Sequence, residues 1–323
     1  MKLTIVLTVY NKEKYLRRAL DSILSQTETE VGEYEVLVVN DGSKDGSSAI
    51  IEEYAHSNPL VRVLTQENQG LSMARNHGTE EAKGDYVWYV DADDIIASFS
   101  VRKICDVMVS QPDIISIYAQ TQGINKIRNE VPVSVKTGKD ILLSHKWQSC
   151  GVFNIFRRSF LLENGLMFLP GIYHEDAEFT PRVLYTAKSV VVVPEVLYTV
   201  IHEPFSITQV PRVKRAFDYL KVAESLNRFV KEKGIAGTDI EDVFNNRISM
   251  VINDALSVIV KNSVEEQRQL DKELGKLSFL MKPMRTSTIL RYRIEGVLFS
   301  VFPCKFTLIY KILKKFDWFL TTI

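Results

Sequence analysis

Strand and helix patterns alternate along the first hundred residues, and this alternation restricts the fold more than any other feature. Residues 3–9 form a continuous apolar, β-branched run, which is typical of a strand buried on both faces. Helical spacing follows over 12–26, with Asn11 as the expected N-cap. Such β-α-β units build a parallel sheet, so we expect an α/β fold. Further strands are predicted at 35–40, 61–65 and 86–90, and further helices at 47–56 and 71–82.

The pattern changes further along the chain. Shorter strands and one-turn helices with frequent prolines are expected over 111–209. Almost no strand pattern follows residue 213, and three helical segments are predicted, at roughly 212–233, 239–262 and 264–280. We therefore expect an α/β domain over 1–210 and a helical C-terminal region over 211–323.

The balance of charge excludes some classes of protein. The chain has 323 residues, with 40 Lys and Arg against 40 Asp and Glu, which excludes a globally basic nucleic-acid binder. The charge is uneven, because residues 282–323 carry +6 and residues 1–281 carry −6. Three cysteines without a pairing or metal-ligand pattern indicate a reducing compartment. With no secretory signal and no apolar run of ~18–20 residues, a cytoplasmic protein is expected.

Polar residues follow three of the predicted strands. Tyr10-Asn11 follows the first strand, residues 40–43 follow the second and residues 91–94 follow the fourth. Sheets of this kind bind ligands at the carboxyl ends of their strands. Neither the glycine-rich dinucleotide fingerprint nor a Walker-type phosphate loop is present after the first strand.

The acidic residues at these strand ends have two interpretations each. Asp91, Asp93 and Asp94 suit Mg²⁺ or Mn²⁺, but Asp93 or Asp94 could instead cap a following helix. Asp41 could be part of a turn or could bind a nucleobase or ribose, while Asp45 is expected to cap the next helix.

A second acidic group stands at His174-Glu175-Asp176. A carboxylate in a cleft can act as a general base, and acids in a first helical turn also stabilise the helix dipole. His202 follows a later strand, and a single histidine there is more often structural than a metal ligand.

Five short segments stand out along the chain: Val9–Asn11, Asn40–Ser47, Asn68–Asn76, Asp91–Asp94 and His174–Asp176. In order and spacing they resemble family 2 glycosyltransferases of the GT-A fold. The resemblance covers about residues 1–210. It implies an enzyme of bacterial polysaccharide synthesis that moves a sugar, with inversion, from a nucleotide-sugar to an acceptor hydroxyl on a glycan or lipid-linked glycan. A UDP-sugar is the favoured donor.

The resemblance also implies roles for residues of the donor site. Asp41 would contact the base, Asp91 would contact the ribose and the metal side, and Asp93 would ligate a Mn²⁺ or Mg²⁺ that bridges the diphosphate. The residues that would hold the nucleoside are Thr8, Tyr10, Asp41 and Arg75.

On the acceptor side, Asp176 would deprotonate the hydroxyl and Glu175 would help to place the sugars. Ile201 stands where the family often has arginine, so His202 is expected to supply that charge near the diphosphate and the metal. Two arginines are alternative phosphate partners, Arg157 and Arg158.

The basic C-terminal tail has helical spacing from residue 306. An apolar face with lysines opposite is typical of a helix in a membrane interface, so residues 297–323 are expected to bind an anionic surface on the inner face of the cell membrane. Packing on the catalytic domain or on a second copy of the chain, as a homo-oligomer, is the alternative. The apolar face comprises Phe306, Ile309, Tyr310, Leu313, Phe316 and Leu320, and the lysines are Lys311, Lys314 and Lys315.

Two other functions stay open from the sequence. The first is a catalytically inactive family member that binds a nucleotide or glycan and acts as a scaffold. The second is a sugar-nucleotide nucleotidyltransferase, whose glycine-rich basic N-terminal loop the chain lacks.

Overall fold

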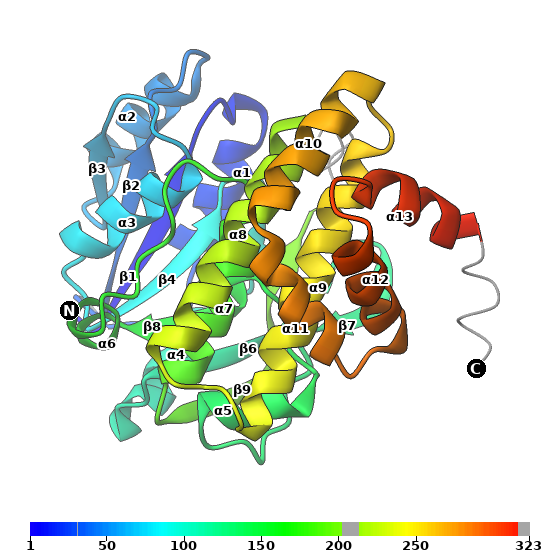
Figure 1. Ribbon diagram of the computed structural model, residues 1–323. Helices are drawn as coiled ribbons and strands as arrows, with labels where there is room; N and C mark the ends of the chain where they lie inside the picture. The colour runs from blue at the N-terminus through cyan, green and yellow to red at the C-terminus, as the bar shows by residue number, and fades with distance from the viewer. Residues whose placement is uncertain (31, 202–212, 316–323) are drawn as a thin grey trace. The chain divides into compact units, whose positions relative to one another are not determined.

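The computed structural model describes residues 1–30, 32–201 and 213–315 (Figure 1). The chain divides into two compact units. The sheet unit comprises Met1–Gly171 and Phe179–Ser206, and the helical unit comprises Ile172–Glu178 and Ile207–Ile323. The short segment 172–178 therefore belongs with the C-terminal helices and not with the residues on either side of it.

The first four strands of the sheet unit are parallel and lie in the order β3-β2-β1-β4. Every residue of β1 and β2 is buried, which explains why their sequences are apolar throughout rather than alternating. The α/β fold predicted from the sequence is confirmed. The elements of this half are β1 (Leu3–Val9), α1 (Glu13–Leu24), β2 (Tyr34–Asn40), α2 (Ser47–Ser57), β3 (Val61–Thr65), α3 (Leu71–Glu81) and β4 (Tyr86–Asp91).

The other half of the sheet is mixed, with the order β4-β8-β6-β9-β5 and β7 paired to β6. Strand β8 runs antiparallel to both β4 and β6, whereas β6 and β9 are parallel. These strands are β5 (Ile95–Ile96), β6 (Ile114–Thr121), β7 (Ile124–Arg128), β8 (Asn154–Arg157) and β9 (Val190–Val200), and the accompanying helices are α4 (Ser100–Val107), α5 (Gly138–Ser144), α6 (Arg158–Glu163) and α7 (Glu175–Thr186).

The expected Asn11 cap is wrong, and so is the alternative in which Asp93 or Asp94 caps a helix. Helix α1 begins at Glu13, and Asn11 has a φ of 52°, so its side-chain Oδ1 accepts a hydrogen bond from the backbone N–H of Lys44 at 2.7 Å instead. Asn11 thus joins two strand-end loops. Asp93 and Asp94 cap no helix, because the two-residue strand β5 follows them.

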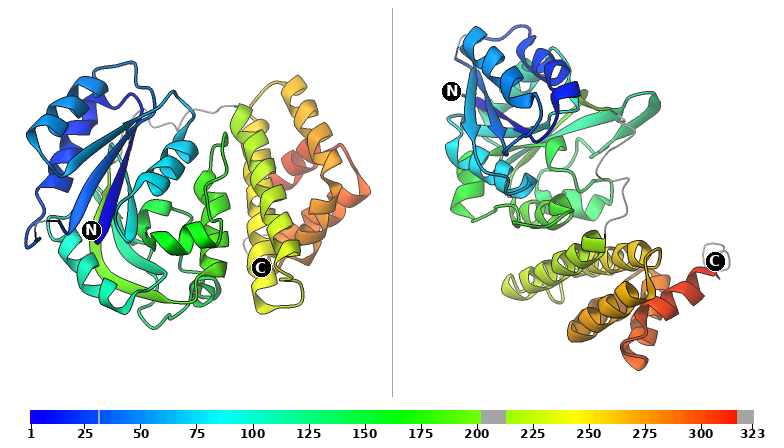
Figure 2. Two further views of the ribbon diagram at one scale, coloured as in Figure 1. Left: turned by 90° about the vertical axis from the view of Figure 1, so that its left-hand side faces the viewer. Right: turned by 90° about the horizontal axis from the view of Figure 1, so that it is seen from above.

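The helical unit is built on two long helices that pack along each other, α8 (Val213–Glu232) and α9 (Asp239–Ile259) (Figure 2). Both were predicted within a few residues of their ends. The Ser263 and Glu266 side chains form a capping box that starts the next helix. The remaining helices are α10 (Val264–Lys276), α11 (Met281–Thr286), α12 (Leu290–Val301) and α13 (Phe306–Lys315).

Buried polar contacts join the last helices to the rest of the helical unit. Asp271 of α10 accepts hydrogen bonds from the backbone N–H and the hydroxyl of Thr307, at 2.9 and 2.8 Å. Glu295 of α12 is fully buried and accepts from Arg291 at 3.0 Å and from Asn253 of α9 at 2.5 Å. Helices α12 and α13 are therefore part of the fold of this unit.

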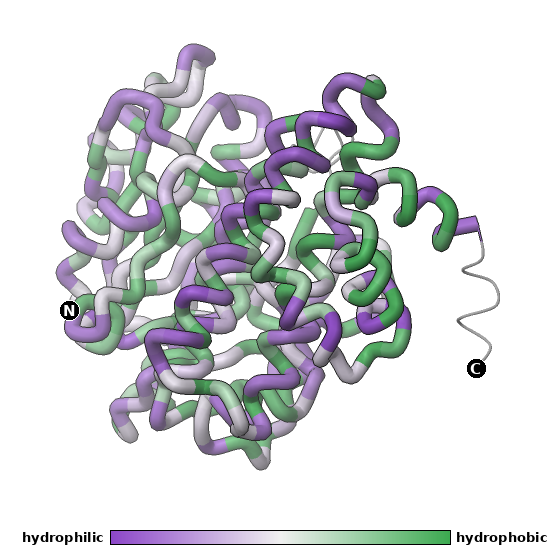
Figure 3. Tube along the Cα trace, viewed as in Figure 1, coloured by the Kyte–Doolittle hydropathy of each residue, from purple (hydrophilic) through white to green (hydrophobic). Residues whose placement is uncertain are grey.

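Packing of α13 corrects the expected membrane face. Phe306, Ile309 and Tyr310 are buried, and the Phe306 ring packs edge-on against Phe299 at 5.2 Å. The hydropathy colours in Figure 3 alternate along α13, but its main apolar face is used inside the unit. Phe316 and Leu320 lie outside the described residues. Within the described ranges, no helix is long and apolar enough to cross a membrane.

Candidate functional site

The carboxyl ends of β1, β2 and β4 meet at one edge of the parallel sheet. Thr8 pairs with Asp91 of β4, and Val9 pairs with Asn40 of β2. Thr8 is buried, whereas Tyr10 is 44% exposed and so is open to a ligand. We call the predicted residues at this edge the strand-end site: Thr8, Tyr10, Asp41, Arg75, Asp91 and Asp93.

Asp41 is 3% exposed and anchors the start of helix α3. Its Oδ1 accepts from Gln66 at 2.7 Å and from the backbone N–H of Gln69 at 2.8 Å, and its Oδ2 accepts from the N–H of Gly70 at 2.9 Å. These donors lie 25 to 29 residues along the chain, so the Asp41 side chain supports the loop before α3 and not its own turn. A carboxylate has about four acceptor positions, so three hydrogen bonds leave room for one more donor.

Gly42 permits the close approach of the neighbouring loop. Its φ is 71°, and a Cβ atom there would lie 2.9 Å from the backbone nitrogen of Asn68. A larger residue would push away the loop whose N–H groups bind Asp41.

Arg75 reaches the strand-end site from inside the protein. It is 1% exposed, and its Nη2 lies 3.1 Å from Oδ1 of Asp91, whose side chain is 34% exposed. The guanidinium also lies over the rings of Tyr89 and Phe168, at 5.8 and 5.2 Å. Arg75 therefore holds Asp91 in place from behind, while the carboxylate itself remains partly open to solvent.

Asp93 lies beside two basic side chains that the sequence reasoning missed. Lys12 forms an ion pair with the Asp93 carboxylate, and Arg18 donates to the Asp93 backbone carbonyl at 2.7 Å. Their signal was available in the sequence, because both follow Tyr10-Asn11 in or just before α1. The site thus contains positive as well as negative charge.

Asp94 turns inward, unlike Asp91 and Asp93. It is 6% exposed and accepts from the Tyr198 hydroxyl at 2.7 Å and from the backbone N–H of Ile201 at 2.8 Å. Burial, and secondly the charge of Asp91, raise the pKa of Asp94 to about 7. These contacts of Asp94 link the loop of residues 91–94 to the end of β9. His202 lies outside the described residues.

The donor set at this edge fits a divalent cation that a nucleotide helps to bind. Over the described part of the chain, no cluster of three or more His, Cys, Asp or Glu could hold a metal ion by itself. Mg²⁺ and Mn²⁺ in nucleotide sites commonly take only one or two carboxylates, with phosphate oxygens completing the shell. The partly exposed carboxylates of Asp91 and Asp93 meet that requirement.

Arg157 and Arg158 are wrong as phosphate partners at this site. Arg157 pairs with Tyr86, at the start of β4, which is the opposite end of the strand from Asp91. Its guanidinium binds Asp113, and that of Arg158 donates to the carbonyls of Thr79 and Glu80. Both arginines have structural roles.

Glu175 and Asp176 begin helix α7 and belong to the helical unit. Glu175 is buried and Asp176 is half-buried. The preceding His174 has a φ of 65°, a left-handed conformation that is uncommon for a residue with a side chain. The left-handed turn at His174 puts Glu175 and Asp176 in the first turn of α7, where the helix dipole favours negative charge.

Comparison with known proteins identifies the family. The family model for glycosyl transferase family 2 matches residues 4–165, which is half of the chain, and the chain therefore belongs to this family and is a glycosyltransferase. It is 29% identical over 254 residues to the uncharacterized glycosyltransferase EpsJ of Bacillus subtilis, covering 74% of this chain and 73% of EpsJ. Membership leaves the nucleotidyltransferase alternative without support.

Two solved structures share the fold. Residues 1–349 of Staphylococcus aureus TarS, in complex with UDP-GlcNAc, match with a TM-score of 0.71 and 19% identity, over 96% of this chain and 92% of that one. The mannosyltransferase PcManGT of Pyrobaculum calidifontis, in complex with GDP-Man and Mn²⁺, matches with a TM-score of 0.52 and 17% identity, over 93% of this chain and 87% of that one. The predicted GT-A fold with a helical C-terminal region is confirmed.

Proposed function

We propose that this glycosyltransferase transfers a sugar, with inversion, from a UDP-sugar to an acceptor hydroxyl on a glycan or lipid-linked glycan of the cell surface. The observation that carries the proposal is the meeting of Asp41, Asp91 and Asp93 at one sheet edge in a family 2 chain. A UDP-sugar is preferred because residues 1–349 of TarS, which share the fold, were crystallised in complex with UDP-GlcNAc.

The nucleoside would lie on Thr8, Tyr10 and Asp41. Asp41 accepts three hydrogen bonds, and its remaining acceptor position suits an N–H group of the base. The half-exposed ring of Tyr10 offers a surface for a planar base. Arg75 would act on the nucleotide through Asp91, since its own guanidinium is buried.

Asp93 and Asp91 would hold Mn²⁺ or Mg²⁺ together with the diphosphate, and His202 is the proposed third contact. The bound cation would neutralise the negative charge that develops on the departing nucleoside diphosphate. Lys12 and Arg18 add positive charge beside Asp93. Their positive charge would favour binding of the anionic nucleotide-sugar at the same edge of the sheet.

Asp176 would act as the general base, with Glu175 positioning the sugars. The acceptor oxygen attacks the anomeric carbon from the face opposite the diphosphate, and its proton passes to the Asp176 carboxylate. The bond from the anomeric carbon to the diphosphate breaks as the new glycosidic bond forms. A single displacement of this kind inverts the anomeric configuration, so one base is sufficient.

A donor screen tests the proposal. The full-length protein is incubated with UDP-, GDP- and TDP-sugars, Mn²⁺ and candidate acceptors, and the anomeric configuration of each product is read by NMR. We expect turnover with a UDP-sugar, an inverted product and loss of activity with EDTA. A retained configuration, or equal turnover with and without a divalent cation, would contradict the assignment.

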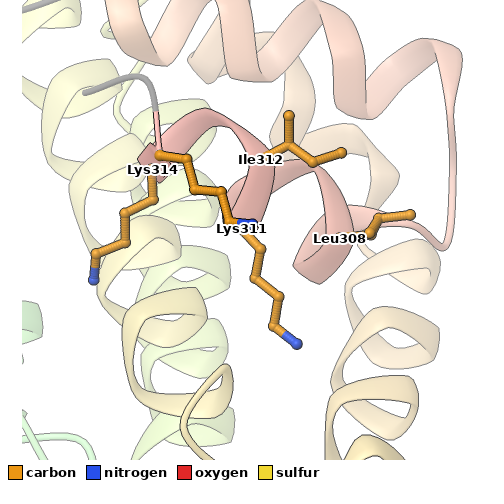
Figure 4. Close-up of a pocket in the computed structure, with 5 residues that line it drawn as sticks. Leu308, Lys311, Ile312 and Lys314 are labelled. Carbon is orange, nitrogen blue, oxygen red and sulfur yellow. The ribbon is translucent and has the colours of Figure 1, made fainter. Parts of the chain in front are cut away.

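We also propose that an exposed surface of α12 and α13 binds an anionic membrane, on a different face from the one first predicted. Leu308 and Ile312 are about half exposed and line a surface pocket with Lys311, Lys314 and Lys315 (Figure 4). On α12 and just after it, Val297, Val301 and Phe302 are also exposed. Because Glu295, the sole acid in the sequence from 277 to 315, is fully buried against Arg291, the charge of this surface is basic.

Sedimentation with vesicles of neutral and anionic lipid tests the membrane proposal. Leu308→Ser with Ile312→Ser should weaken binding to anionic vesicles, and Lys314→Gln with Lys315→Gln should weaken it by about tenfold or more at low salt. Lys272→Gln, on the exposed side of α10, is the control. Wild-type binding by all variants, or a dimer that only the Leu308 and Ile312 substitutions dissociate, would contradict membrane docking.

A further inference from the structure

Residues 172–178, which we call the acidic segment, carry Glu175 and Asp176 and are held by helix α8 within the helical unit. The first contact is at the backbone. The N–H of Tyr173 donates to Oδ2 of Asp218 at 3.0 Å. Asp218 is fully buried and also binds Lys214 and Lys221. Because this buried carboxylate accepts hydrogen bonds from several donors, it fixes the backbone just before Glu175 and Asp176.

The second contact is at the residue before the acidic pair. The His174 ring stacks on Tyr219, with centroids 3.9 Å apart and planes 10° apart, and its Nε2 lies 3.2 Å from Nε of Arg215. Because arginine only donates, Nε2 must accept, which requires a neutral imidazole with its proton on Nδ1. Burial, followed by the charge of Arg215, lowers the pKa of His174 to about 4, although Asp218 acts in the opposite direction.

The third contact lies one turn beyond the pair. Glu178 is 1% exposed, and its Oε1 accepts from the Ser225 hydroxyl at 2.6 Å. Asp218 and Tyr219 come three and four residues after Arg215, and Ser225 comes seven residues, or two turns, after Asp218, so the four side chains lie along one face of α8. The acidic segment is thus fixed before and after Asp176 by a single helix face.

We infer that this face of α8 is a positioning surface for the catalytic base, and that His174 and Tyr219 are its central positioning pair. The inference rests on the proposed role of Asp176. A general base must stay within hydrogen-bonding distance of the proton that it removes, and a shift of about 1 Å can lower turnover by about a hundredfold. The C-terminal helices therefore have a part in catalysis, although they supply no atom that reacts.

The test compares two substitutions at one position. Tyr219→Ala removes the stacked ring, whereas Tyr219→Phe keeps it. We expect Tyr219→Ala to lower turnover by about 10- to 100-fold while the affinity for UDP with Mn²⁺ stays within about twofold of wild type. Tyr219→Phe should retain most of the turnover. Arg228→Ala, on the exposed side of α8, is the matched control and should behave as wild type.

The pH profile separates positioning from a general loss of folded protein. The groups that face His174 are Arg215, Asp218 and Tyr219. Loss of the Tyr219 ring should let water reach His174, so the pKa of His174 should rise from about 4 toward its ordinary value. The acid limb of the pH profile of turnover should then move to higher pH. An unmoved limb, wild-type turnover, or a parallel loss of UDP affinity would overturn the inference.

Two further variants keep the test decisive. If Tyr219→Ala does not fold, Ser225→Ala removes a single hydroxyl from the same face and should lower turnover by about two- to fivefold. Asp176→Asn separates this inference from the proposed function. Full activity in Asp176→Asn refutes the base itself, whereas an inactive Asp176→Asn beside a fully active, folded Tyr219→Ala refutes only the positioning surface.

Discussion

The sheet unit and the helical unit hold their acidic residues in place by different means. In the sheet unit, Asp91 is the last residue of β4, and the register with Thr8 of the neighbouring strand sets its position. In the helical unit, side chains of α8 hold the acidic segment across 41 to 47 residues of sequence. Backbone pairing places the first set, and side-chain packing places the second.

This difference predicts where single substitutions act. In the sheet unit, a change behind the site should weaken the support of one carboxylate, because the strands keep the edge intact. In the helical unit, a change on α8 should move the whole acidic segment. The substitutions below run from the largest expected effect to the smallest.

Removal of Arg75 should have the largest effect on stability. Arg75→Ala leaves a cavity between two rings and removes the partner of Asp91, so the free energy of unfolding should fall by about 3–4 kcal/mol. Urea denaturation measures the loss, and Arg268→Ala at an exposed position of α10 is the control. A loss below about 1 kcal/mol would mean that the buried guanidinium adds little to the fold.

Removal of Glu295 tests the corresponding buried contact of the helical unit. Glu295→Ala leaves Arg291 and Asn253 without their shared acceptor and should lower the free energy of unfolding by about 2–3 kcal/mol. Glu295→Gln keeps the size of the side chain and one acceptor, so it should cost less. Equal losses for the two substitutions would show that Glu295 contributes through its charge and not through the size of its side chain.

Acid should destabilise the helical unit through His174. The pKa of His174 is lowered to about 4 in the folded state, so the unfolded state binds the proton more tightly. Stability should be unaffected above pH 6.5 and should fall by roughly 2 kcal/mol between pH 6.5 and pH 4, after allowance for partial solvent exposure. In His174→Phe, this part of the pH dependence should be absent, and denaturation midpoints from pH 4 to 7 measure it.

The exposed ion pair of Arg17 and Glu53 should have the smallest effect. Its two hydrogen bonds are 2.7 and 2.6 Å long, but both side chains are more than half exposed. Solvent screens such pairs, so Arg17→Ala should leave the denaturation midpoint unchanged within error. A clear shift would show that helices α1 and α2 depend on this surface contact.

The sequence predicts the strand-end half of the molecule well, because the information there is local. Buried parallel strands are apolar throughout, and parallel register brings their ends to one edge, so Tyr10, Asp41 and Asp91 could be grouped without coordinates. Lys12 and Arg18 were missed because a charge near a motif does not reveal its partner. Arg157 was misplaced because β8 runs antiparallel to β4, so the last residue of β8 lies beside the first residue of β4, at the edge opposite the strand-end site.

The helical unit is harder to predict, because a helical period shows that a face is covered but not what covers it. The apolar stripe of α13 was recognised from the sequence, but membrane binding and packing on protein stayed alternatives, and Phe306, Ile309 and Tyr310 pack inside the unit. The contacts of His174 with Arg215 and Tyr219 leave no local pattern at all. Such long-range packing depends on the folded arrangement of the helices.

The most direct measurement of the central claim compares UDP affinity and turnover in Asp93→Ala and Asp176→Asn, both with Mn²⁺ present. We expect Asp93→Ala to lose affinity for UDP by about tenfold or more and to lose turnover with it. Asp176→Asn should keep wild-type affinity while turnover falls by about 10²- to 10⁴-fold. Equal losses of affinity in both variants, or wild-type turnover in Asp176→Asn, would contradict the division between a donor-binding sheet edge and a base on the helical unit.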